Sequence, residues 1–451
     1  MKKIAIAAAL FLALVAARQR AVRPPSSSTP VPVAGPTFSN EIVRIFQDRC
    51  QSCHHPGDIG PFSLMTYADA APHALEIRLM TKTRQMPPWK PVDGCGAFVE
   101  PRVLSQDQID LISKWVENGA PEGNRADLPA PRVYDSNWSI GQPDAVFASP
   151  EPYTPAPSGD IYRCFTIPTH LTSDKYVAAV DVHPGDRNTV HHVIAFIDST
   201  GESQKLDDDD PGPGYTCFGD AGFTPTDPAA ATLGGWAPGS RPVMLPEGVA
   251  YKLPASSRVV LQVHYHPHGA APQPDKTEIG VYYAKTPPRQ LLRIVPLINQ
   301  SFTIPPGNAN YRVTAGLAPP PYEKTPLPVP VHVWLIAPHM HLLGRKMNVT
   351  ATLPSGASEC LINIDDWDFN WQGQYRYAEP LALPAGTRLS LEAFYDNSEN
   401  NFRNPNTPPK AVSWGEKTTD EMCIAFIGVT LDSEDLILGK TADTSWIRPI
   451  R

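Results

Sequence analysis

The feature that most constrains the fold is a series of short β-type runs between turn residues, which begins near Trp138 and fills the rest of the chain. Alternating runs rich in Val, Ile, Thr and aromatic residues, bounded by Gly, Pro, Asn or Asp, predict the strands of a β-sandwich. Examples are KYVAAVDVH, HHVIAFI, SRVVLQVHYH, TEIGVYYA, VHVWLIAPH and TRLSLEAFY. Roughly 300 residues of this pattern predict two all-β sandwiches, with a break near Pro287-Pro288. We place them at residues 138–286 and 287–451.

The composition agrees with this prediction. The 451 residues include 52 prolines, and charged residues make up 19% of the chain, below the roughly 25% of ordinary domains. Such a chain favours short strands and ordered turns over long helices. Its formal charge of −8 offers no basic surface for nucleic acid.

The N-terminus has the layout of a secretory signal peptide, which we assign to residues 1–17. Lys2 and Lys3 precede an apolar run from Ile4 to Ala17, which is too short for a comfortable membrane span. An uncleaved anchor is the alternative. Residues 18–36, rich in Pro and Ser, indicate an extended linker. Because no later run is long and apolar enough to cross a bilayer, we expect an exported, periplasmic or secreted protein with no membrane span in the mature chain.

Residues 37–124 predict a small all-α domain. Ser39 is a candidate cap of its first helix, and Ser105 with Gln108 forms a capping box for its last helix. Gly119 and Pro121 end that last helix. The polar residues 125–137 indicate a second linker.

Within this segment, Cys50-Gln51-Ser52-Cys53-His54 is the C-x-x-C-H motif of covalent haem c attachment. Cys50 and Cys53 would bond to the porphyrin edge, and His54 would ligate the iron; a simple disulfide is the alternative. We choose Met86 as the sixth iron ligand, because prolines can hold its loop open and a thioether supports a higher potential. His73, Met80 and Met65 are the other candidates. The segment resembles small cytochromes c.

Histidines beyond this segment cluster in a few strand-like runs: His191-His192, His264-x-His266 and His339-x-His341. Taken singly, each is more often a core or surface histidine than a ligand. Together, in an exported chain that carries a haem motif, they indicate a metal site, although imidazole alone does not choose between copper, zinc, iron and nickel. Adjacent His191 and His192 can serve one site only if a bulge interrupts the strand.

The runs TVHHVIAF, LQVHYH, HMHLLGRK and TTDEMCIAF occur in that order. They resemble the four ligand motifs of the type II copper, ascorbate-dependent monooxygenases, the family of peptidylglycine α-hydroxylating monooxygenase and dopamine β-monooxygenase. The resemblance covers roughly residues 138 to 440, and HLLGRK leans toward the dopamine enzyme.

The resemblance implies two copper ions. His191, His192 and His264 would hold one copper for electron storage and transfer. His339, His341 and Met422 would form the catalytic site with the second copper, where O₂ and substrate meet. A thioether favours Cu(I), the state that binds oxygen, although a lone methionine is usually core filling. His266 receives no role.

The resemblance also bears on substrate and disulfides. The residues that grip the carboxylate in the peptidylglycine enzymes correspond to Ala337, Ile424 and Phe426 here, which offer neither charge nor hydrogen bond. Cys164 and Cys217 match family cysteines and can pair with each other. A Cys360–Cys423 bridge is a second candidate, which would leave Cys95 free.

The sequence thus predicts a small all-α cytochrome c-like domain followed by two jelly-roll-like β-sandwich copper domains. We expect a copper-dependent monooxygenase that hydroxylates a C–H bond of a small organic molecule with O₂. Ascorbate or another one-electron reductant, or an electron-donor protein, would supply electrons, and the haem would relay them. The alternative is a non-catalytic redox or copper-handling protein.

Overall fold

The computed structural model describes residues 35–134, 138–227, 230–238, 240–267, 271–319, 321 and 324–447. The predicted signal peptide at 1–17 lies outside the described residues, as do 18–34 of the first predicted linker and 135–137 of the second.

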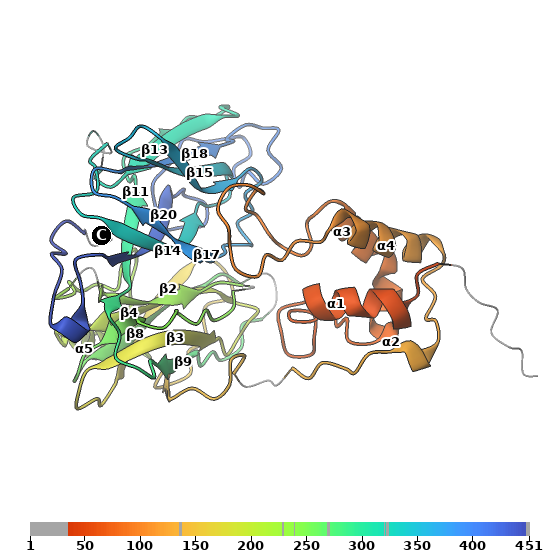
Figure 1. Ribbon diagram of the computed structural model, residues 1–451, viewed down its shortest axis with the longest axis horizontal. Helices are drawn as coiled ribbons and strands as arrows, with labels where there is room; N and C mark the ends of the chain where they lie inside the picture. The colour runs from red at the N-terminus through yellow and green to blue at the C-terminus, as the bar shows by residue number, and fades with distance from the viewer. Residues whose placement is uncertain are drawn as a thin grey trace, which may run out of the picture.

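A helical region comes first and most strands follow (Figure 1). The helices are η1 (Phe38–Ile42), α1 (Val43–Arg49), α2 (Tyr67–Ala70), η2 (Ala71–His73), α3 (Ala74–Lys82), α4 (Gln106–Glu117), η3 (Arg125–Asp127), α5 (Glu202–Asp209) and η5 (Leu436–Leu438). The first ten strands are β1 (Ala145–Ala148), β2 (Ile161–Pro168), β3 (Lys175–His183), β4 (Val190–Asp198), β5 (Tyr215–Thr216), β6 (Thr232–Trp236), β7 (Val249–Leu253), β8 (Arg258–Tyr265), β9 (Glu278–Tyr283) and β10 (Gln290–Leu291). The others are β11 (Arg293–Ile298), β12 (Thr303–Ile304), β13 (Tyr311–Gly316), β14 (Val331–His339), β15 (Gly344–Thr352), β16 (Ser358–Ile364), β17 (Tyr375–Leu383), β18 (Arg388–Tyr395), β19 (Val412–Ser413) and β20 (Ile424–Leu431).

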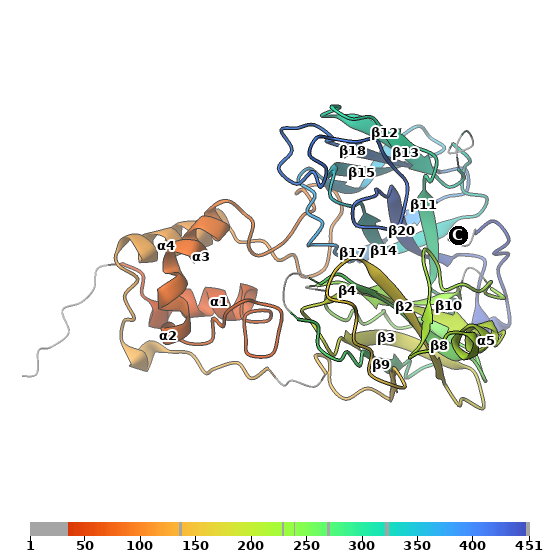
Figure 2. The ribbon, with the colours of Figure 1, turned by 180° about the vertical axis from the view of Figure 1, so that it is seen from behind.

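The strands form four larger sheets and one short pair. Five-stranded sheets run β1-β9-β3-β7-β10 and β5-β2-β8-β4-β6, and four-stranded sheets run β11-β20-β14-β17 and β13-β18-β15-β16. Buried residues of both five-stranded sheets share one hydrophobic core, and those of both four-stranded sheets share another. Seen from the opposite side, the helical region stands beside this β-body (Figure 2).

The predicted fold class, a small all-α cytochrome c-like domain followed by two jelly-roll-like all-β sandwich copper domains, is wrong. The protein is mostly β-sheet with small helices, of which the longest described, α4, has 12 residues. Residues 83–104 contain no helix, because Pro87, Pro88, Pro91 and Pro101 each lack the backbone N–H that a helix needs. This proline-rich segment joins the β-body instead: Pro91 bridges to Ile364 and Phe98 to Tyr377.

The two halves of the β-body are also not independent. Strand β10, which follows the predicted break at 286/287, pairs in parallel with β7 of the preceding half. Leu292 and Leu335 bury their side chains in the core of that preceding half. Apolar burial across the break therefore ties the halves together.

At the level of single helices, one prediction is confirmed and one is wrong. The capping box of α4 is present, with Gln108 N–H donating to Ser105 Oγ and Ser105 N–H donating to the Gln108 side chain. Ser39, in contrast, caps nothing: it lies inside the π-helical turn η1. The Thr37 N–H that precedes this turn donates to the Glu41 carboxylate at 2.8 Å, so a side chain within the turn replaces the predicted cap.

Two disulfides link distant parts of the chain. Cys164 pairs with Cys217, as predicted. The suggested Cys360–Cys423 bridge is wrong, because Cys360 pairs with Cys95 and Cys423 is a buried free thiol. Disulfides persist in oxidising compartments, so these two favour a secretory or extracellular location. Among the helices described, none has the length and apolar character required to span a bilayer.

Candidate metal centre

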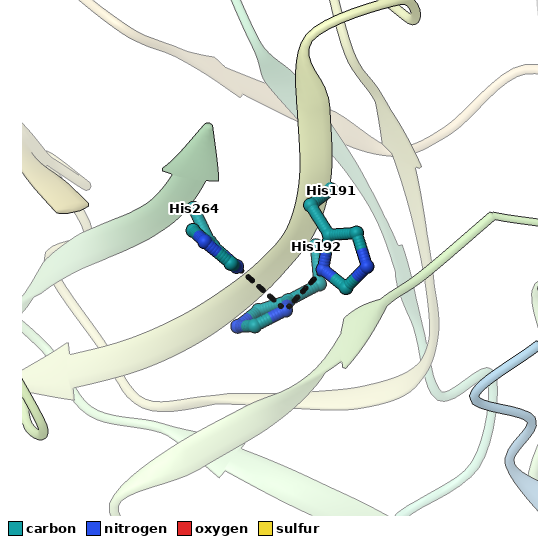
Figure 3. A group of neighbouring side chains, drawn as sticks. All are labelled: His191, His192 and His264. Carbon is teal, nitrogen blue, oxygen red and sulfur yellow. Dashed lines mark hydrogen bonds between the residues drawn. The ribbon is translucent and has the colours of Figure 1, made fainter. Parts of the chain in front are cut away.

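Three histidines meet at the ends of two paired strands. His192 in β4 lies opposite His264 in β8, and the register shifts between Val190 and His192. This irregularity confirms the predicted bulge and turns both His191 and His192 toward His264. His192 Nδ1 lies 3.2 Å from His191 Nδ1 and 3.4 Å from His264 Nδ1 (Figure 3). The Nδ1 atoms of all three rings therefore converge.

The environment of this first cluster keeps its imidazoles neutral. Burial, followed by the neighbouring imidazoles, lowers the pKa of His191 and of His192 well below the ordinary value. Burial also lowers the pKa of His264, although Asp160 acts in the opposite direction. Neutral imidazole is the form that ligates a metal. His191 Nε2 is buried without a hydrogen-bond partner. One ring nitrogen of the cluster is therefore left unsatisfied by the protein.

His339 and His341 form a second cluster at the end of β14. Their ring centroids are 5.1 Å apart. His339 Nδ1 contacts Gln372 Oε1 at 2.7 Å, and His341 Nδ1 contacts the Asp420 carbonyl oxygen at 3.1 Å. Because each acceptor takes the Nδ1–H, both Nε2 atoms are left with a lone pair for a metal. Burial lowers the pKa of His339 to about 4 and that of His341 to about 3.

Met422 lies next to this second cluster along the sheet. It is buried, with 6% of its surface exposed, and it lies two residues before the start of β20. His339 pairs with Ile424 in the antiparallel ladder of β14 and β20, and continuing this register by two residues sets Met422 opposite His341. Tyr395 Oη–H donates to the Met422 carbonyl oxygen at 2.7 Å.

The buried Glu421 carboxylate connects the histidine segment to Met422. It accepts hydrogen bonds from the backbone N–H groups of His341 at 2.9 Å, Leu343 at 2.5 Å and Met422 at 3.2 Å. These bonds fix the loop after β14 against the start of β20. No sequence pattern singles out Glu421, because its role depends on two segments about 80 residues apart.

The two clusters adjoin one another. The ring centroids of His192 and His339 are 6.3 Å apart. The Phe369 ring stacks on His191 at 4.5 Å and meets His341 edge-on at 5.7 Å. Histidines from both halves of the β-body thus face one shared region.

Asp160 is a further residue that sequence analysis missed. His264 Nε2 and His266 Nδ1 lie 3.1 and 2.6 Å from Asp160 Oδ1. The spacing of two residues between His264 and His266 indicates that both side chains lie on one face of the strand, since alternate residues of a strand share a face. This spacing predicts a shared partner for the two histidines but does not identify Asp160. Burial raises the pKa of Asp160, but hydrogen bonds from His264, His266 and Thr418 outweigh it and hold the pKa below its usual range.

The haem motif lies in the helical region. Cys50 follows α1, and both Cys50 and Cys53 are free thiols. Burial, followed by the neighbouring Cys53, raises the pKa of the Cys50 thiol to about 12. His54 Nδ1 contacts the Phe62 carbonyl oxygen at 3.0 Å, which leaves Nε2 for a metal. Gly60 packs so closely that a Cβ there would lie 2.8 Å from His54 Nδ1.

The candidate sixth iron ligands lie in the same region. Met86 is half-buried and its N–H donates to the Met80 carbonyl oxygen. His73 stacks on Phe62 with ring centroids 3.7 Å apart, and the Phe62 ring also contacts His54 at 5.2 Å. Met65 N–H donates to Ser63 Oγ.

Comparison with known proteins defines a class for the C-terminal part. Residues 290–430 match the family model of the copper type II ascorbate-dependent monooxygenase, C-terminal domain. This range contains His339, His341 and Met422. Residues 290–430 are therefore similar to the C-terminal domain of this class of copper-dependent monooxygenase.

Two individual relatives are also monooxygenase proteins by name. DBH-like monooxygenase protein 1 of Mus musculus is 26% identical over 291 residues, which cover 60% of this chain and 44% of the relative. The protein of the same name from Homo sapiens is 25% identical over 333 residues, which cover 66% of this chain and 51% of the relative. The chain spans about half the length of these relatives. The major capsid protein P2 of bacteriophage PM2 aligns with 64% of this chain and 97% of its own, but at 9% identity and a TM-score of 0.25 it supports no conclusion.

Proposed function

We propose that the protein is an exported copper-dependent monooxygenase that hydroxylates a C–H bond of a small organic molecule with O₂. The observation that carries the proposal is the adjacency of two buried imidazole clusters, one with three converging Nδ1 atoms and one whose Nδ1 atoms are held by Gln372 and the Asp420 carbonyl. When bound there, copper supplies electrons to O₂ and activates it for attack on the C–H bond. One oxygen atom enters the substrate and the other leaves as water.

The residues present fit copper. His191, His192 and His264 would bind one ion through their converging Nδ1 atoms. His339 and His341 would bind the other through Nε2, and Met422 would add a soft sulfur that favours the reduced ion. Gln372 and the Asp420 carbonyl hold the second pair of rings in the required tautomer. Phe369 packs between His191 and His341 and limits the access of water.

The substrate is not a peptide with a C-terminal glycine. Residues that would meet its carboxylate, by resemblance to the peptidylglycine enzymes, are Ala337, Ile424 and Phe426. Ala337 pairs with Phe426, and Ile424 pairs with His339, in the β14–β20 ladder. An unpaired carboxylate buried there would cost roughly 2–5 kcal/mol. We therefore expect a substrate with an apolar or aromatic group beside the attacked carbon.

The proposal includes a haem c held by Cys50, Cys53 and His54, with Met86 as sixth ligand and with the haem region at residues 37–124. When bound, the haem would carry single electrons to copper from ascorbate, another reductant or a donor protein. Arg102 hydrogen-bonds the Cys53 side chain and its charge acts on Tyr375. Tyr375 pairs with Ile336, three residues before His339. Arg187, just before β4, forms an ion pair with Asp58 at 3.3 Å.

Isotope labelling tests the proposed activity. Purified protein loaded with copper is given ¹⁸O₂, ascorbate and a panel of aromatic and aliphatic substrates, and products are analysed by mass spectrometry. We expect one ¹⁸O atom in a hydroxylated product, lost in His339→Ala. His332→Ala is the matched control. His332 lies on the same strand, but its Nδ1 contacts Asp432 Oδ1 at a distance of 2.7 Å, and it is not part of the second cluster. Copper binding without oxygen consumption for any substrate would favour a copper-handling protein instead.

A further inference from the structure

Asp160 lies where the two halves of the β-body meet. It immediately precedes β2 and has 11% of its side chain exposed. Its Oδ1 contacts His264 Nε2 at 3.1 Å and His266 Nδ1 at 2.6 Å, both at the end of β8. The contact to His264 uses Nε2, whereas Nδ1 of the same ring is the atom that faces His192. Asp160 therefore contacts the His264 ring nitrogen that is not among the three converging Nδ1 atoms of the first cluster.

The same carboxylate binds the other half of the protein. Thr418 N–H donates to Asp160 Oδ2 at 2.8 Å, and Thr418 Oγ1–H donates to Asp160 Oδ1 at 2.8 Å. Thr418 is buried, with 3% exposed. It begins the short segment that continues through Asp420, whose carbonyl binds His341, to Met422. A carboxylate with four such contacts has little freedom to move.

Tyr162, two residues after Asp160, repeats this arrangement. Its ring stacks on His264 with centroids 4.2 Å apart and an angle of 5°. Its hydroxyl donates to the Glu416 carbonyl oxygen at 2.8 Å. At the start of β2, Asp160 and Tyr162 thus each contact both His264 and the segment 416–422.

We propose that Asp160 is a positioning residue that orients His264 for the first copper and at the same time holds the segment carrying Met422 of the second. This inference rests on the proposed function for the identity of the metal. Carboxylates behind metal-bound histidines fix the ring and raise its basicity, and their loss typically costs about 10–100-fold in metal affinity. Because Asp160 also accepts hydrogen bonds from Thr418, it holds the segment that carries Met422 of the second cluster as well.

The test uses Asp160→Asn, which keeps the size of the side chain but removes its charge and one acceptor oxygen. In the copper-free protein, we expect faster amide hydrogen exchange across residues 416–422. In the copper-loaded protein, we expect about 10–100-fold weaker binding at the first site with an altered Cu(II) electron paramagnetic resonance spectrum. X-ray absorption of the reduced protein should show a weaker sulfur signal from Met422.

Two further variants make the test specific. Asp174→Asn is the matched control, because Asp174 also accepts a backbone N–H, that of Ala255, and it pairs with Lys252 away from the clusters. This variant should change nothing. Thr418→Val removes the hydroxyl contacts of Thr418 to Asp160 and His266 but keeps its N–H bond to Asp160. It should therefore alter the exchange and the sulfur signal but leave the affinity of the first site nearly unchanged.

The outcomes separate this inference from the proposed function. A wild type that binds no copper would overturn the proposed function, while hydrogen exchange would still test the Asp160 contacts. Unchanged exchange in Asp160→Asn, or unchanged spectra at both coppers, would overturn only the positioning role. A third copper per chain, lost in both Asp160→Asn and His266→Gln, would also overturn it by making Asp160 a direct ligand.

Discussion

At the scale of single residues, hydrogen bonds decide which ring nitrogen faces a metal. The Nδ1 atoms of His191, His192 and His264 converge, whereas those of His339 and His341 are occupied by Gln372 and the Asp420 carbonyl. The two clusters would therefore use opposite nitrogens of the same side chain. This difference follows from neighbours that are distant in sequence.

Met422→Ile is expected to preserve the fold and abolish hydroxylation. Isoleucine is close to methionine in volume, so the stability loss should stay below about 1.5 kcal/mol. It lacks the sulfur that stabilises reduced copper. Product formation per copper and thermal unfolding would be measured together, with Met347→Ile, at a buried core position in β15, as the control outside the clusters. Normal turnover in Met422→Ile would show that Met422 is not a ligand.

At the scale of elements, the proline-rich segment between α3 and α4 attaches the helical region to the β-body. Val92 N–H donates to the Asn363 carbonyl, and Val99 N–H to that of Arg376. Trp89 meets Tyr375 edge-on at 5.3 Å. The Cys95–Cys360 disulfide makes this attachment covalent, so strand-like pairing and a cross-link fix the segment in which the sequence predicted only an open loop around Met86.

Replacing both Cys95 and Cys360 with serine should therefore loosen this segment. The bridge spans 265 residues of sequence, and loss of such a cross-link typically costs about 2–5 kcal/mol. We expect a lower free energy of unfolding in urea and new proteolytic cleavage within residues 87–104, with both copper clusters still able to bind copper. Protease resistance equal to that of the wild type would show that the non-covalent contacts suffice.

At the scale of the whole molecule, the helical region contacts the β-body beside both clusters. Arg187 pairs with Asp58 near His191, and Arg102 connects Cys53 with Tyr375 near His339. The segment with the C-x-x-C-H motif thus contacts the β-body through Asp58 and, by way of Arg102, through Cys53. Only the assembled protein brings these segments together.

We expect the purified protein to carry one covalent haem and two coppers, and the haem to reduce the copper. The reason is that a one-electron carrier is linked to a centre that must be reduced between turnovers. Stopped-flow mixing of reduced haem with oxidised copper should show haem oxidation at the rate of copper reduction. Cys53→Ala should lose covalent haem and keep copper. A haem that stays reduced beside oxidised copper would contradict the relay.

Without metal, the protein should become less stable as the pH falls from 7 to 5. Burial lowers the pKa of His339 to about 4 and that of His341 to about 3. Below the ordinary value of roughly 6.5, the unfolded chain therefore binds protons that the folded chain does not. Each imidazole should contribute a loss on the order of 1 kcal/mol across this range.

Urea unfolding at pH 7 and at pH 5 measures this loss. His339→Gln should reduce the pH dependence, and His332→Gln on the same strand is the matched control. An equal loss in the wild type and in His339→Gln would show that His339 is not held neutral by burial.

The sequence by itself determined the β-rich character, the α4 capping box, the need for a bulge at His191-His192 and the three histidine pairs, because these depend on local periodicity and spacing. Tertiary structure decided the rest. The proline-rich segment joined the β-body because its backbone groups needed partners that no helix could give. Cys360 paired with Cys95 rather than Cys423, and Asp160 and Glu421 became part of the clusters, because contacts between distant segments depend on how sheets pack. Such packing satisfies buried polar groups over the whole molecule, and no local pattern records it.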